Sequence, residues 1–163
     1  AAQRDRQNAC VKALGSEGLA VLIGSYNHTL DDQSRVTVPA KWRQDLGAGV
    51  VLTRGIDGAL LGMPFEEWER LSAKLAALPV SNKKAQSVQR NLTRWACECE
   101  MDKQGRVVIP QKLRELAQIQ EDVVLIGMTN HIELWSAEVL DVHDEQEDSD
   151  YDECLAEAAE FGI

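Results

Sequence analysis

Residues 31–43 read DDQSRVTVPAKWR, and residues 102–114 read DKQGRVVIPQKLR. These two stretches decide the fold, because an aspartate, a glutamine, two arginines, a proline and a lysine recur in them at an offset of 71 positions. A repeat at a fixed offset indicates two copies of one structural unit. We place the two units at residues 21–80 and 81–143.

The negative charge of the chain is concentrated at its C-terminal end. The 163 residues include 17 Lys and Arg against 27 Asp and Glu, a formal net charge of −10, yet residues 133–163 hold 12 of the acidic and none of the basic residues. The rest of the chain has a balance of +2, so the net charge does not argue against nucleic acid as a partner. We expect a poorly ordered N-terminal extension over residues 1–20 and an acidic C-terminal tail over residues 144–163.

Three short strands are predicted in each unit. Runs of β-branched residues follow polar turns, and Asp57-Gly58 between apolar runs is typical of a tight hairpin, because glycine accepts a positive φ. We expect strands at 36–38, 50–53 and 59–63 in the first unit, and at 107–109, 123–126 and 132–135 in the second.

Helices are predicted between these strands and after them. Pro39 and Pro110 stand where a proline opens a helix. The apolar spacing of three and four residues predicts longer helices that begin at Pro64 and, with Ser81 as its cap, after residue 81. The residues expected on the inner sides of the two short helices are Trp42 and Leu46 in the first unit and Leu113 and Leu116 in the second.

The two units are small. A unit of roughly 60 residues buries little apolar surface alone. We therefore expect an α+β body in which the units interlock, or in which copies oligomerise, or both.

The motif Asp-x-x-x-Arg occurs before the first strand of each unit. A carboxylate four residues before a guanidinium can hold a tight turn closed by a bidentate pair, and Asp31 with Arg35, and Asp102 with Arg106, have this spacing. The pattern alone is loose, and its simplest interpretation is a structural staple of the turn.

The wider sequence resembles the MraZ family of bacterial transcriptional regulators. The resemblance lies in residues 26–31, 35–43, 51–58, 65–68 and 102–110. It implies two tandem AbrB-like units of the swapped-hairpin type with short helices. It also implies a ring-shaped homo-oligomer that binds short repeated boxes of double-stranded promoter DNA, upstream of the division and cell-wall gene cluster.

The spacing makes Asp31 and Asp102 structural partners of the turns, and the resemblance maps the arginine of the family motif onto Arg35 and Arg106. Arginine can bind guanine bidentately in the major groove, and lysine or glutamine can add phosphate or base contacts. The neighbours expected to contact DNA are Lys103, Gln33 and Gln104. For four further cations we expect one of two roles, contact with a DNA phosphate or exposure to solvent only: Lys41, Arg43, Lys112 and Arg114.

Other functional classes find little support. The cysteine and histidine spacing predicts no metal site, and we expect no cofactor, no small-molecule substrate and no enzymatic activity. The apolar runs are shorter than the ~18 residues of a membrane span, and the first residues do not read as a secretion signal, which favours a cytoplasmic, nucleoid-associated protein. Two alternatives remain: a protein-interaction module that does not bind DNA, and a self-processing enzyme cut at Gly24-Ser25.

Overall fold

The computed structural model describes residues 21–162, so the predicted extension over residues 1–20 lies outside the described residues. The elements occur in the same order in both halves. The first half comprises β1 (Ser25–Thr29), β2 (Arg35–Thr37), α2 (Ala40–Leu46), β3 (Gly49–Arg54), β4 (Leu60–Pro64) and α3 (Phe65–Ala76). The second comprises β5 (Cys97–Glu100), β6 (Arg106–Val108), α5 (Gln111–Leu116), β7 (Asp122–Gly127), β8 (Ile132–Ser136) and α6 (Ala137–Glu157), followed by η1 (Ala158–Phe161). Helix α4 (Lys83–Trp95) joins the halves.

The two halves exchange their first strands. The six-stranded sheet has the order β1-β7-β8-β4-β3-β5, so β1 of the first half pairs with β7 of the second and β5 of the second pairs with β3 of the first. All of these pairs are antiparallel. Strands β2 and β6 form a separate antiparallel ribbon across the halves. The expected α+β fold, with interlocked units in one body, is confirmed.

The pairing registers relate the halves by an approximate twofold rotation. In the ribbon, Val36 lies opposite Val107, the same position of the repeated motif. In the large sheet, Leu61 of β4 lies opposite Glu133 of β8, again at matching places in the two halves. Antiparallel pairing of equivalent residues places the rotation axis through both pairs.

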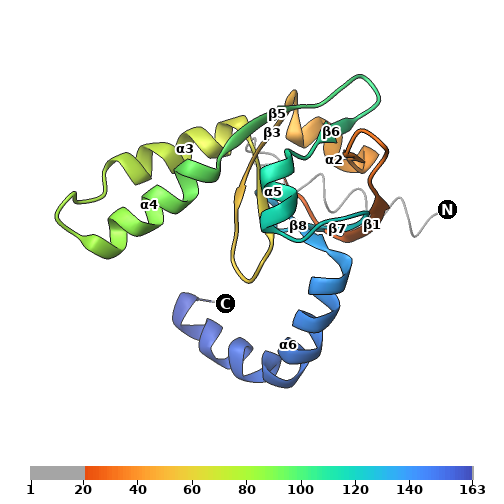
Figure 1. Ribbon diagram of the computed structural model, residues 1–163. Helices are drawn as coiled ribbons and strands as arrows, with labels where there is room; N and C mark the ends of the chain where they lie inside the picture. The colour runs from red at the N-terminus through yellow and green to blue at the C-terminus, as the bar shows by residue number, and fades with distance from the viewer. Residues whose placement is uncertain (1–20, 163) are drawn as a thin grey trace.

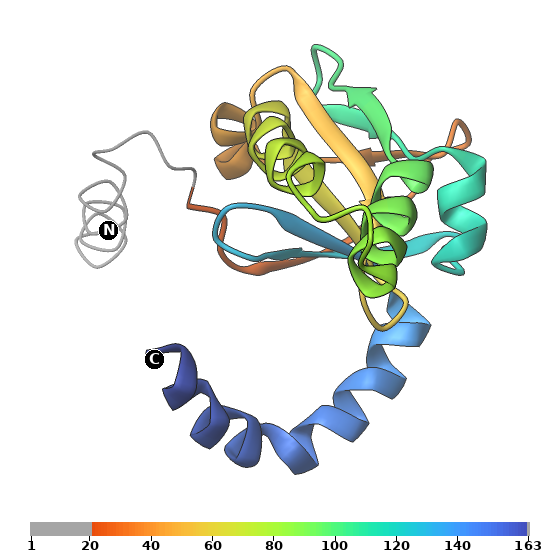
Figure 2. The same cartoon turned by 90° about the vertical axis from the view of Figure 1, so that its left-hand side faces the viewer.

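One hydrophobic core serves both halves. Val36 and Val107 are each 2% exposed, and Leu52 of β3 and Leu125 of β7 are fully buried in the same cluster. Figures 1 and 2 show the short helices and the ribbon gathered around the sheet, while α3 and α4 extend to one side. Because the core residues come from both halves, the exchange of strands joins the halves into one body.

Helix α4 differs from the expected cap and packing. Asn82, and not Ser81, caps the helix, since its Oδ1 accepts a hydrogen bond of 3.0 Å from the backbone N–H of Ala85. The expected apolar stripe is only partly covered: no residue of α4 is buried, and Val88 is 53% exposed. The helix is fixed to the sheet at Thr53, whose Oγ1 donates to the carbonyl of Leu92 at 2.6 Å.

The acidic tail is helical over most of its length. The residues expected to form it begin inside α6 and continue through η1, and Figures 1 and 2 show this segment as an arc that leaves the sheet. Only the start of α6 packs on the body, where Leu140 is buried in a small cluster with Trp135. Within residues 21–162 we find no helix with the length and apolar character that crossing a membrane requires.

Helix α5 adds one core position to the predicted ones. Leu113 is fully buried, but Leu116 is only partly buried, and Ala117 lies in the core at 2% exposure. The spacing explains this: Ala117 follows Leu113 by four residues, as Leu46 follows Trp42, and one helical turn of about 3.6 residues brings these pairs to one side. The helix ends there, and Gln118 adopts a φ of 57°.

This difference predicts unequal effects of two leucine truncations. Leu113→Ala removes a side chain from the shared core and should lower the free energy of unfolding by about 2–5 kcal/mol. Leu116→Ala, in the same short helix, should cost clearly less because its side chain is partly solvated. Urea unfolding followed by circular dichroism measures both, and equal losses would contradict the assignment of Leu113 to the core.

Candidate nucleic-acid interface

The first Asp-x-x-x-Arg turn is closed by its own aspartate. Oδ1 of Asp31 accepts hydrogen bonds from the backbone N–H groups of Gln33 (3.0 Å) and Arg35 (2.9 Å). Oδ2 accepts a third from Nε of Arg35 at 2.7 Å. One carboxylate therefore fixes both the backbone of the turn and the direction of the arginine side chain.

The second turn repeats this arrangement. Asp102 Oδ1 accepts from the N–H groups of Gln104 and Arg106, both at 2.9 Å, and its Oδ2 accepts from Nε of Arg106 at 2.8 Å. In this geometry Asp31 and Asp102 each close their own turn. Because the two turns share one set of contacts, the repeat preserves a precise local geometry and not only a pattern of letters.

Each turn is also bound to the other half of the chain. Gly105, at the tip of the second turn, has a φ of 76°, and Ser34 at the matching place has a φ of 58°. The carbonyl of Gly105 accepts a hydrogen bond from Val38 N–H (2.8 Å), and that of Ser34 accepts one from Ile109 N–H (3.0 Å). The two turns thus lie at opposite ends of one ribbon, each next to the end of the other half's strand.

The ribbon of β2 and β6 has one buried and one outer face. Val36 and Val107 point into the core, so the alternation of a strand sends the flanking residues outward. The register places Arg35 opposite Val108 and Thr37 opposite Arg106. Val108 is 50% exposed. The outer face is therefore a two-stranded surface with an arginine at each end, and B-DNA's major groove admits a β-ribbon of this kind.

The two arginines are oriented and still have donors free for a ligand. Their side chains are 22% and 29% exposed, for Arg35 and Arg106 respectively. Only Nε of each is hydrogen-bonded within residues 21–162, and the Nη groups make no such bond there. A guanidinium held through Nε presents its Nη groups in a fixed direction, which suits bidentate contact with a planar acceptor such as a guanine edge or a phosphate.

The aspartates are stabilised as carboxylates. Hydrogen bonds from the backbone of Arg35 lower the pKa of Asp31 below its ordinary value of 3.8, with a further contribution from the Arg35 side chain. The pKa of Asp102 is lowered in the same way by Arg106. The turns therefore keep their charge, and their geometry, throughout the neutral pH range.

The other predicted contact residues fall into two groups. The exposed residues at the turns and in the first turn of each short helix are Gln33, Gln104, Lys103, Lys41 and Lys112. Arg43 and Arg114 are instead engaged locally: their Nε groups donate at 3.0 Å to the carbonyls of Val38 and Ile109. These two arginines stabilise the ends of the ribbon, and contact of any of these residues with DNA stays a prediction.

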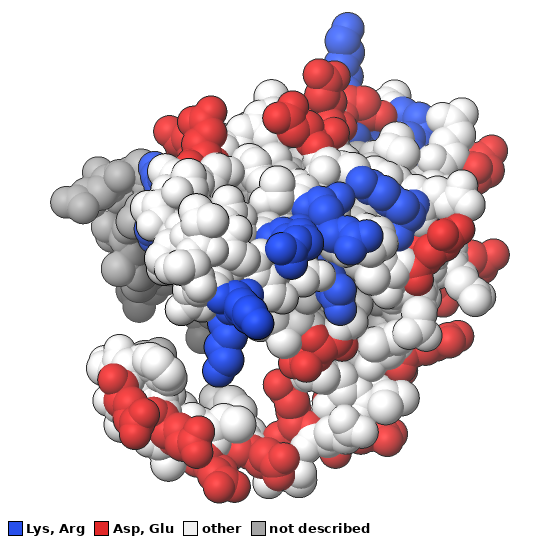
Figure 3. Space-filling model, turned by 60° about the vertical axis from the view of Figure 1, so that its left-hand side comes forward, with Lys and Arg blue, Asp and Glu red and all other residues white. Residues whose placement is uncertain are grey.

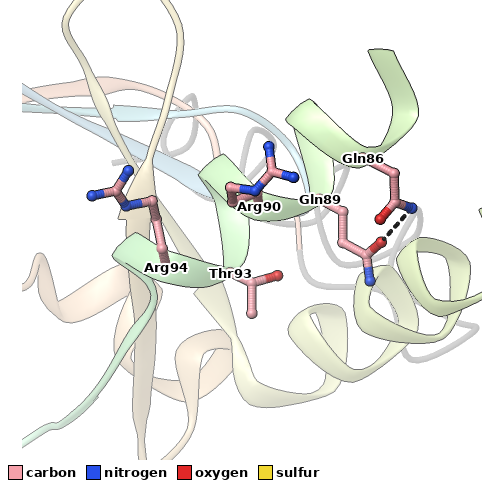
Figure 4. Close-up of a pocket in the computed structure, with 5 residues that line it drawn as sticks. All are labelled: Gln86, Gln89, Arg90, Thr93 and Arg94. Atoms are coloured by element: carbon pink, nitrogen blue, oxygen red, sulfur yellow. Dashed lines mark hydrogen bonds between the residues drawn. The ribbon is translucent and has the colours of Figure 1, made fainter. Parts of the chain in front are cut away.

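A second basic surface lies on α4, outside the residues predicted to contact DNA. Figure 3 shows Lys and Arg side chains gathered in the middle of one face and acidic side chains along the curved helix below. Figure 4 shows Arg90 and Arg94 beside a shallow hollow, with Gln86, Gln89 and Thr93 completing its lining. The run from Lys83 to Trp95 contains four cations and no acid, which is the sequence signal for this surface.

Cys99 offers no reactive thiolate beside the turns. Burial raises the pKa of Cys99 to about 11, so its thiol stays protonated near neutral pH. Its Sγ donates to the carbonyl of Cys97 at 3.6 Å. Both residues serve β5, one at the edge of the core and one inside it.

The lowered aspartate pKa values predict an acid-sensitive stabilisation. Because the folded pKa values lie below the ordinary 3.8, the contribution of the turns is complete above that pH and is lost as the pH falls through the folded values. D31N/D102N should therefore unfold more easily than the parent protein at pH 7, with a difference that shrinks below about pH 4. Urea unfolding across this pH range measures it. Asp32→Asn in the same turn is the control, and a pH-independent difference would contradict the explanation.

The tip of the second turn predicts a glycine requirement. A Cβ on Gly105 would collide with the guanidinium of Arg43. Gly105→Ala incurs about 1–2 kcal/mol of left-handed strain and should lose about 1 kcal/mol more, because Arg43 must release the Val38 carbonyl. In an Arg43→Ala background this collision is absent, so the same glycine substitution should cost about 1 kcal/mol less. Thermal and urea unfolding compare the two backgrounds, and equal losses would show that Arg43 moves aside freely.

Comparison with known proteins adds the family. The chain matches the family described as "MraZ protein, putative antitoxin-like" over residues 21–91 and again over residues 92–158, so the family itself is built on the repeat. A protein of Thermoanaerobacter sp. strain X514, named Transcriptional regulator MraZ, is 44% identical over 143 residues, which cover 88% of this chain and all of the relative.

Two further relatives carry the same name. The protein of Halothermothrix orenii is 41% identical over 143 residues, covering 88% of this chain and all of that protein. The protein of Caldicellulosiruptor saccharolyticus is 48% identical over 118 residues, covering 72% of this chain and 82% of that protein. Two family segments with exchanged strands, together with relatives of this identity along nearly their whole length, show that the chain belongs to the MraZ family.

Proposed function

We propose that this chain is a transcriptional regulator that binds double-stranded promoter DNA sequence-specifically through the β2–β6 ribbon. The observation that carries the proposal is the pair of arginines, Arg35 and Arg106, each oriented through Nε by the aspartate of its turn. A ribbon that presents preorganised guanidinium groups at both ends can enter a major groove and bind guanine edges. The names of the relatives, Transcriptional regulator MraZ, support the same function.

Exposed lysines near the arginines can contact the phosphate backbone of DNA. Lys103 is exposed beside Arg106, and Lys41 and Lys112 are exposed where α2 and α5 begin. Phosphate contacts of this kind position a protein on the duplex while base contacts supply the specificity. In this proposal Gln33 and Gln104, exposed at the turns, add base or phosphate contacts.

Binding to tandem boxes would supply the affinity that one subunit lacks. The outer face of one ribbon is small, and the chain as a whole carries a charge of −10. Several ribbons in a ring-shaped homo-oligomer can bind several boxes at once, and the effective concentration of linked sites then multiplies weak contacts. In the proposed role the boxes lie upstream of the division and cell-wall gene cluster, and the protein acts in the cytoplasm on the nucleoid.

The second candidate is a protein-interaction module that binds no DNA. The observation that favours it is the acidic α6 and its neighbours, where 12 acidic residues occur without a base over residues 133–163. Salt separates the candidates: phosphate contacts release counterions, so the affinity for DNA falls steeply as salt rises. We expect no catalytic activity from either.

The DNA-binding role predicts weaker binding when the arginines are truncated. R35A/R106A should bind promoter fragments with TGGG-like repeats more weakly, by about 5- to 150-fold for each arginine–base pair removed, which corresponds to about 1–3 kcal/mol. Fluorescence anisotropy on intact and scrambled boxes measures it at several salt concentrations.

The matched control is Arg70→Ala, an arginine of α3 that is bound to Glu67 far from the ribbon in sequence. It should leave affinity and specificity unchanged. Unfolding curves of both variants establish that they fold. If R35A/R106A bound the boxes as tightly as the parent protein, the ribbon would not be the DNA-binding surface.

A further inference from the structure

The second half of α6 has no partner within the described chain. Residues 144–157 contain eight acidic residues and no base. All of their side chains are exposed. The contacts of α6 go to β7, to β8 and, through His143, to Asp57 in the turn before β4, and at its end to η1. Like charges at this density repel one another and destabilise the helix. A partner of opposite charge would stabilise it.

This helix also exposes apolar residues in a regular line. Tyr151 is 63% exposed and Leu155 is 50% exposed. They continue a line that begins with Asp144 and Asp148, because successive spacings of four, three and four residues keep side chains on one face. We call these four residues, Asp144, Asp148, Tyr151 and Leu155, the acidic stripe.

Helix α4 carries the complementary line at the same spacing. Lys83, Ser87, Arg90 and Arg94 also follow one another by four, three and four residues, and all four are exposed. We call them the cationic stripe. No carboxylate among residues 21–162 lies within 4.0 Å of these three cations, and Figure 4 shows the guanidinium groups of Arg90 and Arg94 on the same side of α4.

The two stripes match in length and in order. Each spans 11 residue steps, about 16 Å of helix. Packed antiparallel, Arg90 meets Asp148 and Arg94 meets Asp144. Ser87, the small residue, then faces Tyr151. The ring of Tyr151 can also accept the guanidinium of Arg90 on its face, and the aliphatic stem of Lys83 can cover Leu155.

A comparison of the two halves shows that α6 lacks a neighbouring helix that corresponds to α4. In the first half, α3 follows β4 and is succeeded by α4, which turns back through residues 77–82. In the second half, α6 follows β8 in the same way but is succeeded only by the short η1. The place that α4 takes beside the first half is left open beside the second.

We propose that the acidic stripe of one copy binds the cationic stripe of the next copy, with the two helices antiparallel. The contact joins two different surfaces, so each copy offers one of each, and such head-to-tail contacts close into rings when the rotation permits. The proposal rests on the proposed function only for the expectation that copies form a ring. It assigns the acidic helix to assembly, and it leaves both arginine turns of the ribbon outside this contact.

Charge reversal tests the contact with the full chain. R90E/R94E and D144R/D148R should each lose the oligomer at about 150 mM salt, where exposed charges are screened beyond about 8 Å. An equimolar mixture of the two variants should regain it, because each variant then finds the opposite charge on its neighbour. Native mass spectrometry and light scattering give the masses. K41E/K112E, which changes the net charge as R90E/R94E does but on α2 and α5, is the matched control for that variant and should assemble normally.

The outcomes separate this inference from the proposed function. An R90E/R94E protein that keeps the mass of the parent oligomer would overturn the contact, and so would a parent protein that is monomeric. If R90E/R94E assembles but binds DNA weakly, α4 is a nucleic-acid surface and the inference also fails. If the mixture of reversal variants stays dissociated although both fold, the pairing is wrong.

A cross-linking experiment covers the case in which a reversal variant does not fold. Copies with Arg90→Cys mixed with copies with Asp148→Cys should form disulfide-linked dimers above the level given by the parent protein with its own cysteines. No increase would overturn the contact. The affinity of R35A/R106A for DNA is measured independently of all these results.

Discussion

The antiparallel pairing of β2 with β6 is the interaction on which the rest of the structure depends. It brings Val36 and Val107 together at the centre of the shared core, and it fixes which half of the chain each turn must contact. The carbonyls of Ser34 and Gly105 then bind the backbone of the opposite half. Because the inner face of the ribbon completes the core, its outer face is held rigidly, and the arginines at its ends have a defined separation. A functional surface built on a strand that the core requires is more precise than one built on a free loop.

The aspartate of each turn orients its arginine before DNA binds. A free arginine loses side-chain entropy when it is fixed in a DNA groove, a loss of up to about 2 kcal/mol. In this chain part of that entropy is already lost on folding, because Asp31 and Asp102 each accept a hydrogen bond from the Nε of their arginine. The Nη groups stay available, and the local carboxylate does not compete for them. The aspartate that closes the turn and the arginine proposed to contact DNA therefore act together. The structural interpretation of the motif does not exclude the functional one.

The sequence predicted the parts of the fold that local chemistry determines. The repeat, the strands on either side of each helix and the Asp-Arg turns depend on spacing within a few residues, and the structure has them. The exchange of β1 and β5 could not be located in this way, because the same apolar alternation would let each strand pair within its own half. Leu116 packs against the core but stays partly exposed, whereas Ala117, one residue further along, lies inside the core, which the spacing did not predict. The site residues beyond the turns, such as Arg43, needed three-dimensional contacts to show that their Nε groups bind carbonyls of the ribbon ends.

The departures from twofold symmetry separate the two surfaces of the molecule. At the ribbon the halves are nearly equal, with the same hydrogen bonds in both turns and valines opposite one another. Away from it they diverge: Leu61 faces Glu133 on the same axis, α3 is succeeded by the cationic α4, and its counterpart α6 is itself acidic and is succeeded only by η1. Twofold symmetry of the ribbon suits DNA binding, because both arginines can then make equivalent contacts with DNA. A head-to-tail contact between copies needs the reverse, since two identical charged surfaces would repel. The chain therefore keeps its repeat alike where DNA is proposed to bind and unlike where copies are proposed to meet.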